Sequence, residues 1–411
     1  MLLLYNLGIR VYYFIILLVS PFNRKARLWI RGRKGIFNQL REKIDPGSEI
    51  IWFHCSSLGE FEQGRPVIEK IRETLPGRKI LLTFFSPSGY EIRKNWPGAD
   101  YIYYLPLDTR KNAATFISLV KPQIAFFVKY EFWFHYLSQL KQSDIKTYLI
   151  SGIFRFRQIF FRSCGRWFRN ILRSFTHFFV QDQDSAYLLK SAGFNNITVC
   201  GDTRFDRVYA IAGKATELPL IRSFVSGKMT LIAGSTWPPD EQIIVQFINE
   251  NNLPVRFIFA PHEIHEREIR QLQESIKRKS ARYSSAVESD IDDAEVLIID
   301  TIGILSSVYQ YGNIAYIGGG FGKGIHNILE AATFGLPVII GPNFKNFREA
   351  NDLIRKNGAF SISNYDYFKN ILNNLFSDNQ LLNKAGEIAR EYVRNNLGAT
   401  DTITKFVLAS L

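Results

Sequence analysis

A glycine-rich stretch, GGGFGKG, runs from residue 318 to 324, and the polar residues Asn327 and Glu330 follow it. Glycine lets a backbone approach a ligand closely, and a helix beginning near Ile325 would turn its free N–H groups toward the loop, which favours an anion. Asn327 and Glu330 are three residues apart, so both can face the loop, where a carboxylate can accept hydrogen bonds from a ribose diol. The alternative for Glu330 is a first-turn glutamate that only complements the helix dipole. The glycine spacing matches neither the dinucleotide nor the P-loop signature, so a binding site for a dinucleotide or a triphosphate is poorly supported.

Glu60 is a candidate general base. It stands just after a buried-strand pattern, EIIWFHCSS at 49–57, in the first turn of a helix expected over 59–75. The positive end of that helix would keep the carboxylate ionised, and Gly59 leaves room for an acceptor molecule. The alternative is a first-turn glutamate without a chemical role.

Histidine and cysteine give little sign of a metal site. The motif PHEIHE suggests a metal pair in His262 and His265, but the sequence offers no third ligand beside them. The three cysteines, Cys55, Cys164 and Cys200, lie far apart and suit a reducing compartment rather than a zinc site.

Two sheets are needed to position these residues. Short apolar runs alternate with amphipathic stretches, which is typical of parallel strands with crossover helices. The first series of strands is expected at 49–57, 79–86, 101–107, 123–130, 146–152 and 177–182, and the second at 229–236, 255–261, 295–300, 313–319 and 336–342. Residues 207–228 carry no strand signal and contain Gly213, Pro219 and Gly227, so we expect a linker there. The pattern predicts an α/β fold of two Rossmann-like domains facing across a cleft.

Length and charge limit the function classes. The chain has 411 residues, 46% of them hydrophobic, and a formal net charge of +13. The length predicts two domains, and the basic excess leaves nucleic acid, an anionic membrane or a phosphorylated substrate as partners.

The N-terminus indicates a membrane anchor over residues 1–22 with the body in the cytosol. Residues 11–19 are all apolar, and six basic residues follow between 24 and 34. Arg10 makes the apolar run short for a clean membrane span. The alternative is the buried first helix of a soluble protein.

Six arginines alternate with aromatic residues between 154 and 175. Such a segment can bind nucleic acid by phosphate contact and stacking, or lie at a membrane interface. An amphipathic core helix with a solvated face is the plain alternative. The N-terminal anchor favours a membrane or a phosphorylated lipid, and no nucleic-acid partner is expected.

The glycine-rich region has a recognisable pattern over its full length. GGGFGKGIHNILEAATFGLPVIIGPNFKNF resembles the signature of the bacterial Kdo transferases, G-G-S-…-G-G-H-N-x-L-E-P-A-…-G-x-P-V-…-G-P-…-N-F. Six further motifs resemble those of the family in the family's order: HCSSLGE (54–60), SPSGYE (86–91), YEFW (130–133), GDTRFD (201–206), AGST (233–236) and DTIGIL (300–305). Each motif is weak alone, but seven in order over most of the chain are specific.

The resemblance implies an inverting GT-B glycosyltransferase of lipopolysaccharide biosynthesis. It would move Kdo (3-deoxy-D-manno-octulosonic acid) from CMP-Kdo onto a lipid A precursor, lipid IVA. Residues 23–206 would bind the acceptor, 229–384 would bind CMP-Kdo, and the C-terminal helix over 385–411 could pack back on the first domain. The protein would work at an anionic membrane surface, on the cytoplasmic side of the cell inner membrane, without a cofactor or metal. Another GT-B transferase, a UDP-sugar epimerase and an inactive membrane-associated scaffold are the alternatives.

The family's site residues carry over to matching positions. Glu60 matches the catalytic base, and Arg204 falls on a lysine that stabilises charge. Lys129 stands where the family has the first glutamate of E-x-E-L-W-P-N, whereas Glu131 keeps the second. The nucleotide contacts fall on Pro261, His262, Ile302, Gly303, Ile304, Asn327, Ile328, Leu329 and Glu330. At Ile304 the family has a glutamate, so only backbone contacts can survive there.

Overall fold

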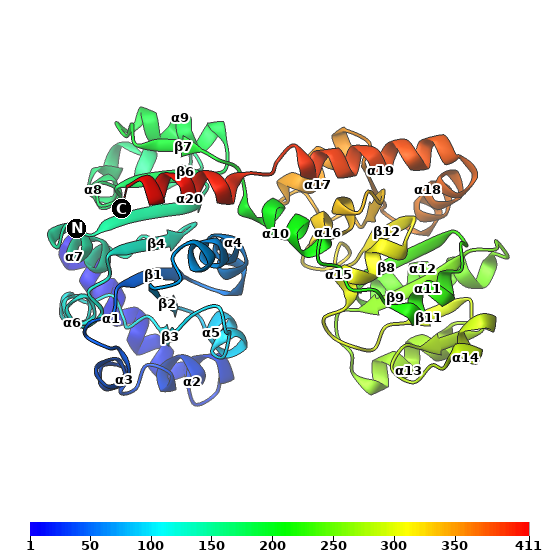
Figure 1. Cartoon of the computed structure of the whole chain (residues 1–411), viewed down its shortest axis with the longest axis horizontal. Coiled ribbons are helices and arrows are strands. Elements are labelled where there is room, and N and C mark those ends of the chain that lie inside the picture. Colours follow the sequence, from blue (N-terminus) through cyan, green and yellow to red (C-terminus); the bar gives the residue numbers. More distant parts are fainter. Residues whose placement is uncertain (411) are drawn as a thin grey trace. The chain divides into compact units, whose positions relative to one another are not determined.

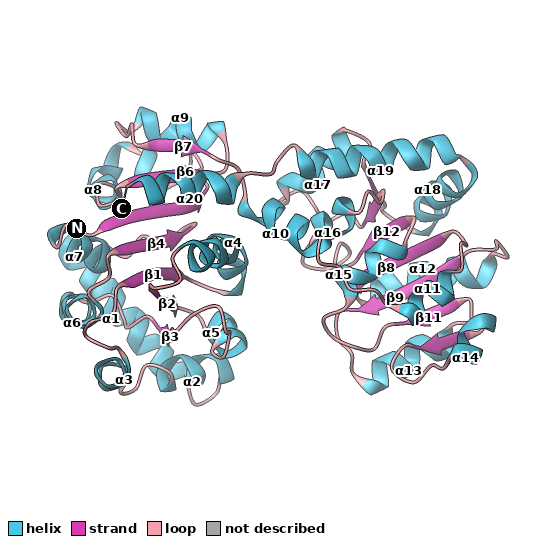
Figure 2. Cartoon of the chain, in the orientation of Figure 1, coloured by secondary structure: helices cyan, strands magenta, loops and turns pink. Residues whose placement is uncertain are grey.

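The computed structural model describes residues 1–410, and the chain divides into two compact units. Unit 1 contains residues 1–206 and the C-terminal residues from 397 on, and unit 2 contains Arg207–Asn396. Each unit has one seven-stranded sheet in which all paired strands are parallel (Figure 2). Helices lie between successive strands, so the predicted α/β class with two Rossmann-like units is confirmed.

The sheet of unit 1 has the strand order β3-β2-β1-β4-β5-β6-β7. Its strands are β1 (Ile50–Cys55), β2 (Lys79–Phe84), β3 (Tyr101–Tyr104), β4 (Ile124–Val128), β5 (Lys146–Gly152), β6 (His177–Val180) and β7 (Ile197–Val199). Its helices are α1 (Leu2–Val19), α2 (Arg24–Arg31), α3 (Ile36–Lys43), α4 (Leu58–Thr74), α5 (Pro87–Arg93), α6 (Arg110–Val120), α7 (Phe134–Gln142), α8 (Arg166–Leu172), α9 (Gln183–Ser191) and α20 (Ala399–Ala409), and α10 (Thr203–Ala212) begins in it.

Strand β1 shows why this sheet needs helices on both faces. Alternate residues of a strand point to opposite faces, and every residue of β1 is buried. Ile51 and Phe53 belong to one apolar cluster, with side chains of α4 and α20. Trp52 belongs to another, with side chains of α3, α6 and α7.

The sheet of unit 2 has the order β10-β11-β9-β8-β12-β13-β14. Its strands are β8 (Thr230–Thr236), β9 (Arg256–Pro261), β10 (Ser280–Arg282), β11 (Val296–Ile298), β12 (Ile314–Ile317), β13 (Val338–Ile340) and β14 (Ala359–Ser361). Its helices are α11 (Pro219–Val225), α12 (Pro238–Glu250), α13 (Glu266–Ser275), α14 (Glu288–Asp293), α15 (Leu305–Val308), α16 (Ile328–Thr333), α17 (Arg348–Arg355), α18 (Tyr365–Ser377) and α19 (Asn379–Arg394). Residues 207–228 are largely helical, because α10 continues to Ala212 and α11 buries Ile221 and Phe224.

The last helix of the chain, α20, packs on α4 of unit 1 (Figure 1). The carboxylate of Asp206 accepts the N–H groups of Gly398 and Thr400, both at 2.7 Å, and so caps the beginning of α20. Ile403 and Val407 then bury against the sheet. The preceding helix α19 belongs to unit 2, so the chain returns to unit 1 only near residue 397.

The N-terminal helix α1 is not a core helix. None of its residues is buried, and by length and composition alone it is apolar enough to cross a membrane. The alternative of a buried first helix is therefore wrong.

The arginine-rich segment from 154 to 175 is a short irregular region followed by α8. Phe154, Phe160 and Phe175 are buried, whereas Phe156 is 77% exposed. Arg169 donates to two backbone carbonyl groups of the same segment. Most of these aromatic side chains therefore form core, as the plain alternative expects, but two 3-10 turns precede α8 and break the expected single helix.

Candidate active site

Each sheet reverses its direction of growth at one place, between β1 and β4 in unit 1 and between β8 and β12 in unit 2. In open parallel sheets, ligands bind beyond the carboxyl ends of the strands at such a point. The loop after β1 leads to Glu60, and the loop after β4 begins at Lys129. In unit 2 the loop after β12 is the glycine-rich stretch. The topology therefore brings the predicted residues to the expected end of each sheet.

Glu60 lies in the first turn of α4. The backbone N–H of Ser57 donates to Oε2 of Glu60 at 3.1 Å, and the Ser57 hydroxyl hydrogen-bonds to the same oxygen. This capping box stabilises the helix start, so the structural alternative for Glu60 describes a contact that is present. Both bonds use Oε2, so Oε1 of this half-buried side chain is the oxygen that remains to take a proton.

Glu131 is part of a buried polar network below that loop. Its Oε2 accepts the indole N–H of Trp133 at 2.6 Å and lies 3.1 Å from Nε2 of His54, which is fully buried. The indole nitrogen of Trp133 also lies 3.1 Å from Nε2 of His54, so His54, Glu131 and Trp133 form one cluster of polar contacts. The other ring nitrogen of His54 lies 2.9 Å from the Thr83 hydroxyl, which accepts the indole N–H of Trp52. Because Glu131 is only 7% exposed, its contacts here position the β4–α7 loop.

Lys129 has a positive φ of 68°, a left-handed conformation that side chains other than glycine seldom adopt. Its N–H donates to the carbonyl of Ile150 at 3.0 Å, which closes β4 against β5. Its ammonium lies 5.4 Å from the centre of the Tyr130 ring. Lys129 and Glu131 flank Tyr130. The side chain of Lys129 is half-buried, whereas that of Glu131 is buried.

Arg204 is held by the carboxylate of Asp202. The Arg204 Nε and Nη2 atoms lie 2.9 and 2.8 Å from Oδ2 of Asp202. The same oxygen lies 3.5 Å from the amide nitrogen of Gln63 in α4. Gln63 is three residues after Glu60, so Arg204 is tied to the helix that carries the candidate base.

The glycine loop of unit 2 is tightly packed against neighbouring turns. A Cβ atom on Gly318 would overlap the carbonyl oxygen of Ser235, and one on Gly320 would lie 2.6 Å from Cα of Gly341. At Gly322 the nearest atom would be 3.6 Å away. Packing therefore explains Gly318 and Gly320, whereas Gly322 has room for a side chain.

Asp240 is a fully buried carboxylate that ties three elements together. It accepts the N–H of Trp237 at 3.0 Å, the N–H of Gly319 at 2.9 Å and the hydroxyl of Tyr316 at 2.7 Å. It thereby fixes the glycine loop to the N-terminus of α12 and to β12.

Three rings stack beside this loop. The His262 and His326 rings are 4.3 Å apart and nearly parallel, and Trp237 lies 4.8 Å from His262. The indole N–H of Trp237 donates to Nε2 of His326 at 3.0 Å, so the proton of neutral His326 is on Nδ1. Burial lowers the pKa of His326, and the neighbouring His262 lowers it further. The exposed His262 ring is thus the outer member of a fixed aromatic surface.

The helix after the loop begins at Ile328, not near Ile325, because Asn327 is its N-cap. Oδ1 of Asn327 accepts the N–H of Leu329 at 3.2 Å, and its Nδ2 donates to Oε1 of Glu330 at 3.0 Å. Ile328 and Leu329 are fully buried, so their side chains are core and only their backbone is available to a ligand.

The remaining nucleotide candidates lie on two other loops of unit 2. Pro261 ends β9, and Ile302, Gly303 and Ile304 follow β11. Ile302 is 86% exposed, and Gly303 has a φ of +95°. The buried hydroxyl of Thr301 has no hydrogen-bond partner among the described residues. A ligand contact through the backbone of this loop fits these facts.

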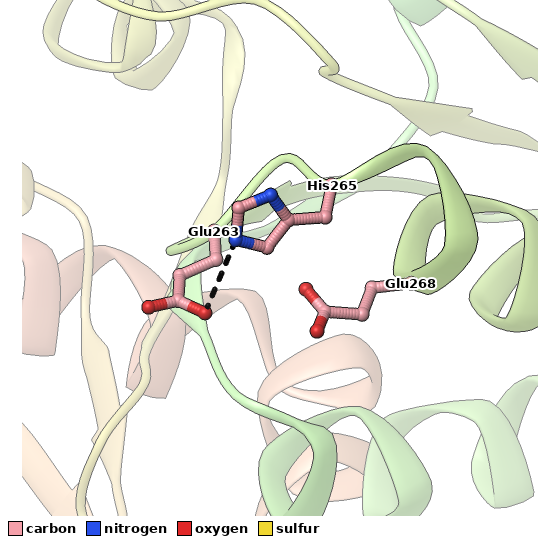
Figure 3. A group of neighbouring side chains, drawn as sticks. All are labelled: Glu263, His265 and Glu268. Carbon is pink, nitrogen blue, oxygen red and sulfur yellow. Dashed lines mark ion pairs between the residues drawn. The ribbon is translucent and has the colours of Figure 1, made fainter.

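One group of side chains in unit 2 has metal-ligand chemistry. Glu263, His265 and Glu268 place their ligand atoms within 4.8 Å of one another, and the sequence-based statement that His265 has no third ligand nearby is therefore wrong (Figure 3). His265 lies 3.7 Å from Glu263, while His262 stacks on other rings and is not part of the group. All three side chains are exposed, and acidic groups on a surface commonly occur without an ion.

Sequence reasoning missed several residues that shape the site. Asp240 and Trp237 follow the AGST motif in the sequence WPPD, where a proline pair and an acidic residue mark a helix start. His326 lies directly before Asn327, and His54 lies inside a buried strand. A histidine in a fully apolar strand needs a buried partner, a signal that could have indicated the link to Glu131.

Comparisons with known proteins agree with the motifs. Residues 29–207 match the family model described as 3-deoxy-D-manno-octulosonic-acid transferase (kdotransferase). The chain is 27% identical over 333 residues to the 3-deoxy-D-manno-octulosonic acid transferase of Aquifex aeolicus, covering 79% of this chain and 85% of that one. It is 26% identical over 422 residues to the enzyme of the same name from Rickettsia bellii, covering 97% and 99%.

Solved structures support the fold. A UDP-GlcNAc 2-epimerase from Neisseria meningitidis matches with a TM-score of 0.61 and 14% identity, over 88% of this chain and 100% of that one. A glycosyltransferase from Rickettsia africae matches with a TM-score of 0.56 and 14% identity, over 88% and 98%. Both matches extend over the two sheets, which confirms the GT-B fold class. The seven motifs in order, the match of residues 29–207 to the family model and the sequence similarity over nearly the whole chain make this protein similar to the 3-deoxy-D-manno-octulosonic acid transferases.

Proposed function

We propose that this protein transfers Kdo from CMP-Kdo to a hydroxyl group of the lipid A precursor lipid IVA, with inversion, at the cytoplasmic side of the inner membrane. The observation that carries the proposal is the position of Glu60, at a strand-to-helix turn of the switch point in unit 1, with Oε2 held by Ser57. A fixed carboxylate with one oxygen remaining is suited to general base catalysis.

In the proposed reaction Glu60 takes the proton of the acceptor hydroxyl through Oε1. The acceptor oxygen forms a bond to the anomeric carbon of Kdo while the bond from that carbon to the phosphate oxygen of CMP breaks. The electron pair of the broken bond leaves with CMP, so attack from the opposite side inverts the anomeric centre. Ser57 keeps the carboxylate oriented throughout, because it binds the oxygen that does not take the proton.

The donor would bind to unit 2. His262 offers an exposed ring for the cytosine base or a donor for the phosphate, on a surface that Trp237 and His326 hold in place. Asn327 and Glu330 lie at the start of α16, where the carboxylate can accept hydrogen bonds from the ribose diol. In unit 1, Arg204 offers a guanidinium that Asp202 orients toward phosphate or carboxylate chemistry.

The direct test incubates purified protein with detergent-dispersed lipid IVA and either CMP-Kdo or UDP-sugars, followed by nucleotide release and mass spectrometry of the lipid. CMP release with a lipid product heavier by one or more Kdo units supports the proposal. Turnover of UDP-GlcNAc without a change in the lipid would support an epimerase instead. Binding of CMP-Kdo without any turnover would support an inactive scaffold.

We propose further that the reaction needs no divalent metal. Transfer should persist in excess chelator, with the decay of CMP-Kdo followed separately in a sample without protein. A Glu263→Gln/Glu268→Gln variant serves as the structural control, since these carboxylates form the candidate group. Activity that is lost with chelator, restored by added metal and absent in the double variant would contradict the proposal.

A further inference from the structure

Helix α1 has two faces of different character. Successive residues of an α-helix are rotated by about 100°, so residues three, four and seven apart share a face. Leu3, Leu7, Val11, Phe14 and Leu18 follow this spacing, and all are exposed apolar side chains. The less exposed residues of α1 lie on the opposite side: Tyr5, Asn6, Ile9 and Ile16. One face therefore contacts unit 1, and the other is an unpartnered apolar stripe.

The N-terminal half of α1 is attached to unit 1 by hydrogen bonds. The hydroxyl of Tyr5 donates to the buried carboxylate of Asp108, and Oδ1 of Asn6 lies 2.6 Å from Nε2 of His135. Asp108 also accepts the N–H groups of His135 and Tyr136, at 3.1 and 3.0 Å, and so caps α7. The attachment of α1 thus uses a group on which the fold of unit 1 depends.

The middle of α1 is attached by aromatic contacts. The ring of Tyr12 lies 6.0 Å from those of Trp29 and Phe85, and the ring of Tyr13 lies 6.2 Å from Trp29, which is buried. Residues 5 to 13 therefore lie along the protein over a length of about 12 Å. Outside this stretch α1 has only residues 2–4 before it and 14–19 after it, and the longer piece spans roughly 9 Å, against a hydrocarbon core of about 30 Å.

A basic trough runs beside the attached face. Two adjoining pockets are lined from α1 by Asn6, Ile9, Arg10 and Tyr13, and from the opposite wall by Leu107 to Lys111 and by residues of α2 and α3. Five exposed basic side chains line the two pockets: Arg10, Arg31, Lys34, Arg110 and Lys111. Within residues 1–410 none of the five forms an ion pair. Arg10 stands on the helix surface between the attached face and the apolar stripe.

We propose that α1 lies in the plane of the membrane, with its apolar stripe among the acyl chains and the phosphate headgroups of anionic lipids in the basic trough. A helix bound along one side to a folded unit presents its other side to the bilayer, and apolar faces of such helices bury by about 5–10 Å. The arrangement puts positive charge at headgroup level, directly beside the inserted stripe. The inference rests on the membrane location in the proposed function but not on sugar transfer, so vesicle binding tests it independently of activity.

The first test measures the contribution of the trough. Full-length protein is co-sedimented with vesicles of phosphatidylcholine alone or with 30% phosphatidylglycerol added. Arg110→Gln/Lys111→Gln should weaken binding to the anionic vesicles by roughly 25-fold, since each basic side chain near the surface contributes roughly fivefold. Binding to neutral vesicles should change by less than about twofold. The control Lys190→Gln/Lys405→Gln removes the same charge from exposed positions of unit 1 outside the trough.

Equal weakening of vesicle binding by the two double variants would mean that only net charge matters. It would overturn the proposal that the trough binds lipid headgroups. Free phosphate is the other possible occupant. Inorganic phosphate that releases the wild-type protein no better than chloride of equal ionic strength supports a membrane headgroup site. Specific release by phosphate at millimolar concentration would show a site for the free ion.

The second test measures orientation. Nitroxide labels are attached to Val11→Cys and Leu18→Cys in a Cys164→Ser background, which removes the exposed native thiol. An in-plane helix places both labels at the same depth. A spanning helix would place them about 10 Å apart along the membrane normal, since they are seven residues apart. Unequal depths, or modification of Leu3→Cys by an impermeant reagent enclosed in the vesicles, would overturn the in-plane arrangement. Neutral-vesicle binding that survives Leu7→Glu/Phe14→Glu would overturn insertion of the stripe.

Discussion

The Nε2 atom of His54, in β1, lies 3.1 Å from Oε2 of Glu131, which follows the neighbouring strand β4 at the switch point of unit 1. His54 is fully buried, whereas Glu131 lies in the loop between β4 and α7. This pair holds the two loops that carry Glu60 and Lys129 at a fixed spacing. Its contribution to the unfolding free energy can be measured.

A double-mutant cycle should show that His54 and Glu131 act together. His54→Ala and Glu131→Ala each take one hydrogen-bond partner away from a buried polar group, which costs about 1–3 kcal/mol of unfolding free energy. The coupling between them should be about 0.5–3 kcal/mol in urea titrations, because the second substitution removes the group that had already lost its partner. Additive losses would show that the pair contributes nothing beyond its separate packing. Trp133→Phe, which keeps the ring and removes one donor to Glu131, is the milder control.

Glu60→Gln should abolish most transfer while CMP-Kdo still binds. General base catalysis contributes about 10²–10⁴-fold, and the amide keeps the shape of the side chain without its basicity. Turnover and donor binding are measured separately, the latter by calorimetry. Glu69→Gln is the matched control, because it lies on the same helix and is exposed. An unchanged turnover number in Glu60→Gln would end the assignment of the base.

Substitutions at two glycines of the loop test its packing and its contact with a ligand separately. Gly318→Ala should lower the unfolding free energy by about 1–3 kcal/mol, since the new Cβ overlaps the Ser235 carbonyl and neighbouring backbone must move. Gly322→Ala should change stability by less than about 0.5 kcal/mol, because its nearest neighbour is 3.6 Å away. If a ligand lies against Gly322, this variant weakens CMP-Kdo binding while the fold is unchanged. Similar stability of the two variants would contradict the packing argument.

Unit 2 should lose unfolding free energy in mild acid, because the pKa of His326 is lowered in the folded protein. Burial and the adjacent His262 lower its pKa, whereas Asp240 opposes the shift and Trp237 donates to its Nε2. The unfolded chain therefore takes up a proton first as the pH falls through about 6.5, so the stabilisation is present above that pH and is lost below it.

The measurement compares urea unfolding at pH 7 and pH 5. Wild type should lose more stability than His326→Gln, by up to about 1.4 kcal/mol per pH unit. His265→Gln is the control, because that side chain is exposed and outside the stack. An NMR titration that places the His326 pKa above 6.5 would contradict the argument.

The central strands and the edge strand β3 were predictable, whereas the other three edge strands were not. Runs such as EIIWFHCSS indicate strands because both faces of a central strand are buried, and β1 is apolar apart from His54. The edge strands β7, β10 and β14 have three residues each and are partly exposed, so they leave no apolar run. The predicted start of the helix after the glycine loop was three residues early, because the capping role of Asn327 was not recognised.

The site was predictable in its positions but not in its contacts. Loops at the ends of parallel strands must converge, which is why Glu60, Lys129 and the glycine loop lie where the pattern indicated. Partners far apart in the sequence, such as Asp240 with Gly319, depend on the register of strands and leave no local signal. The burial of Ile328 and Leu329 was overlooked because a family motif does not separate core residues from contacts.

The return of α20 to unit 1 has a consequence for biogenesis. The first 206 residues leave the ribosome long before Ile403 and Val407, which complete one face of their sheet, and Asp206 must wait for Gly398 and Thr400. Unit 2, in contrast, is a continuous segment that can fold as soon as it emerges. Unit 1 is therefore synthesised first but completes its fold last. Loss of α20 through a premature stop or a protease would destabilise unit 1, although α20 follows unit 2 in the sequence.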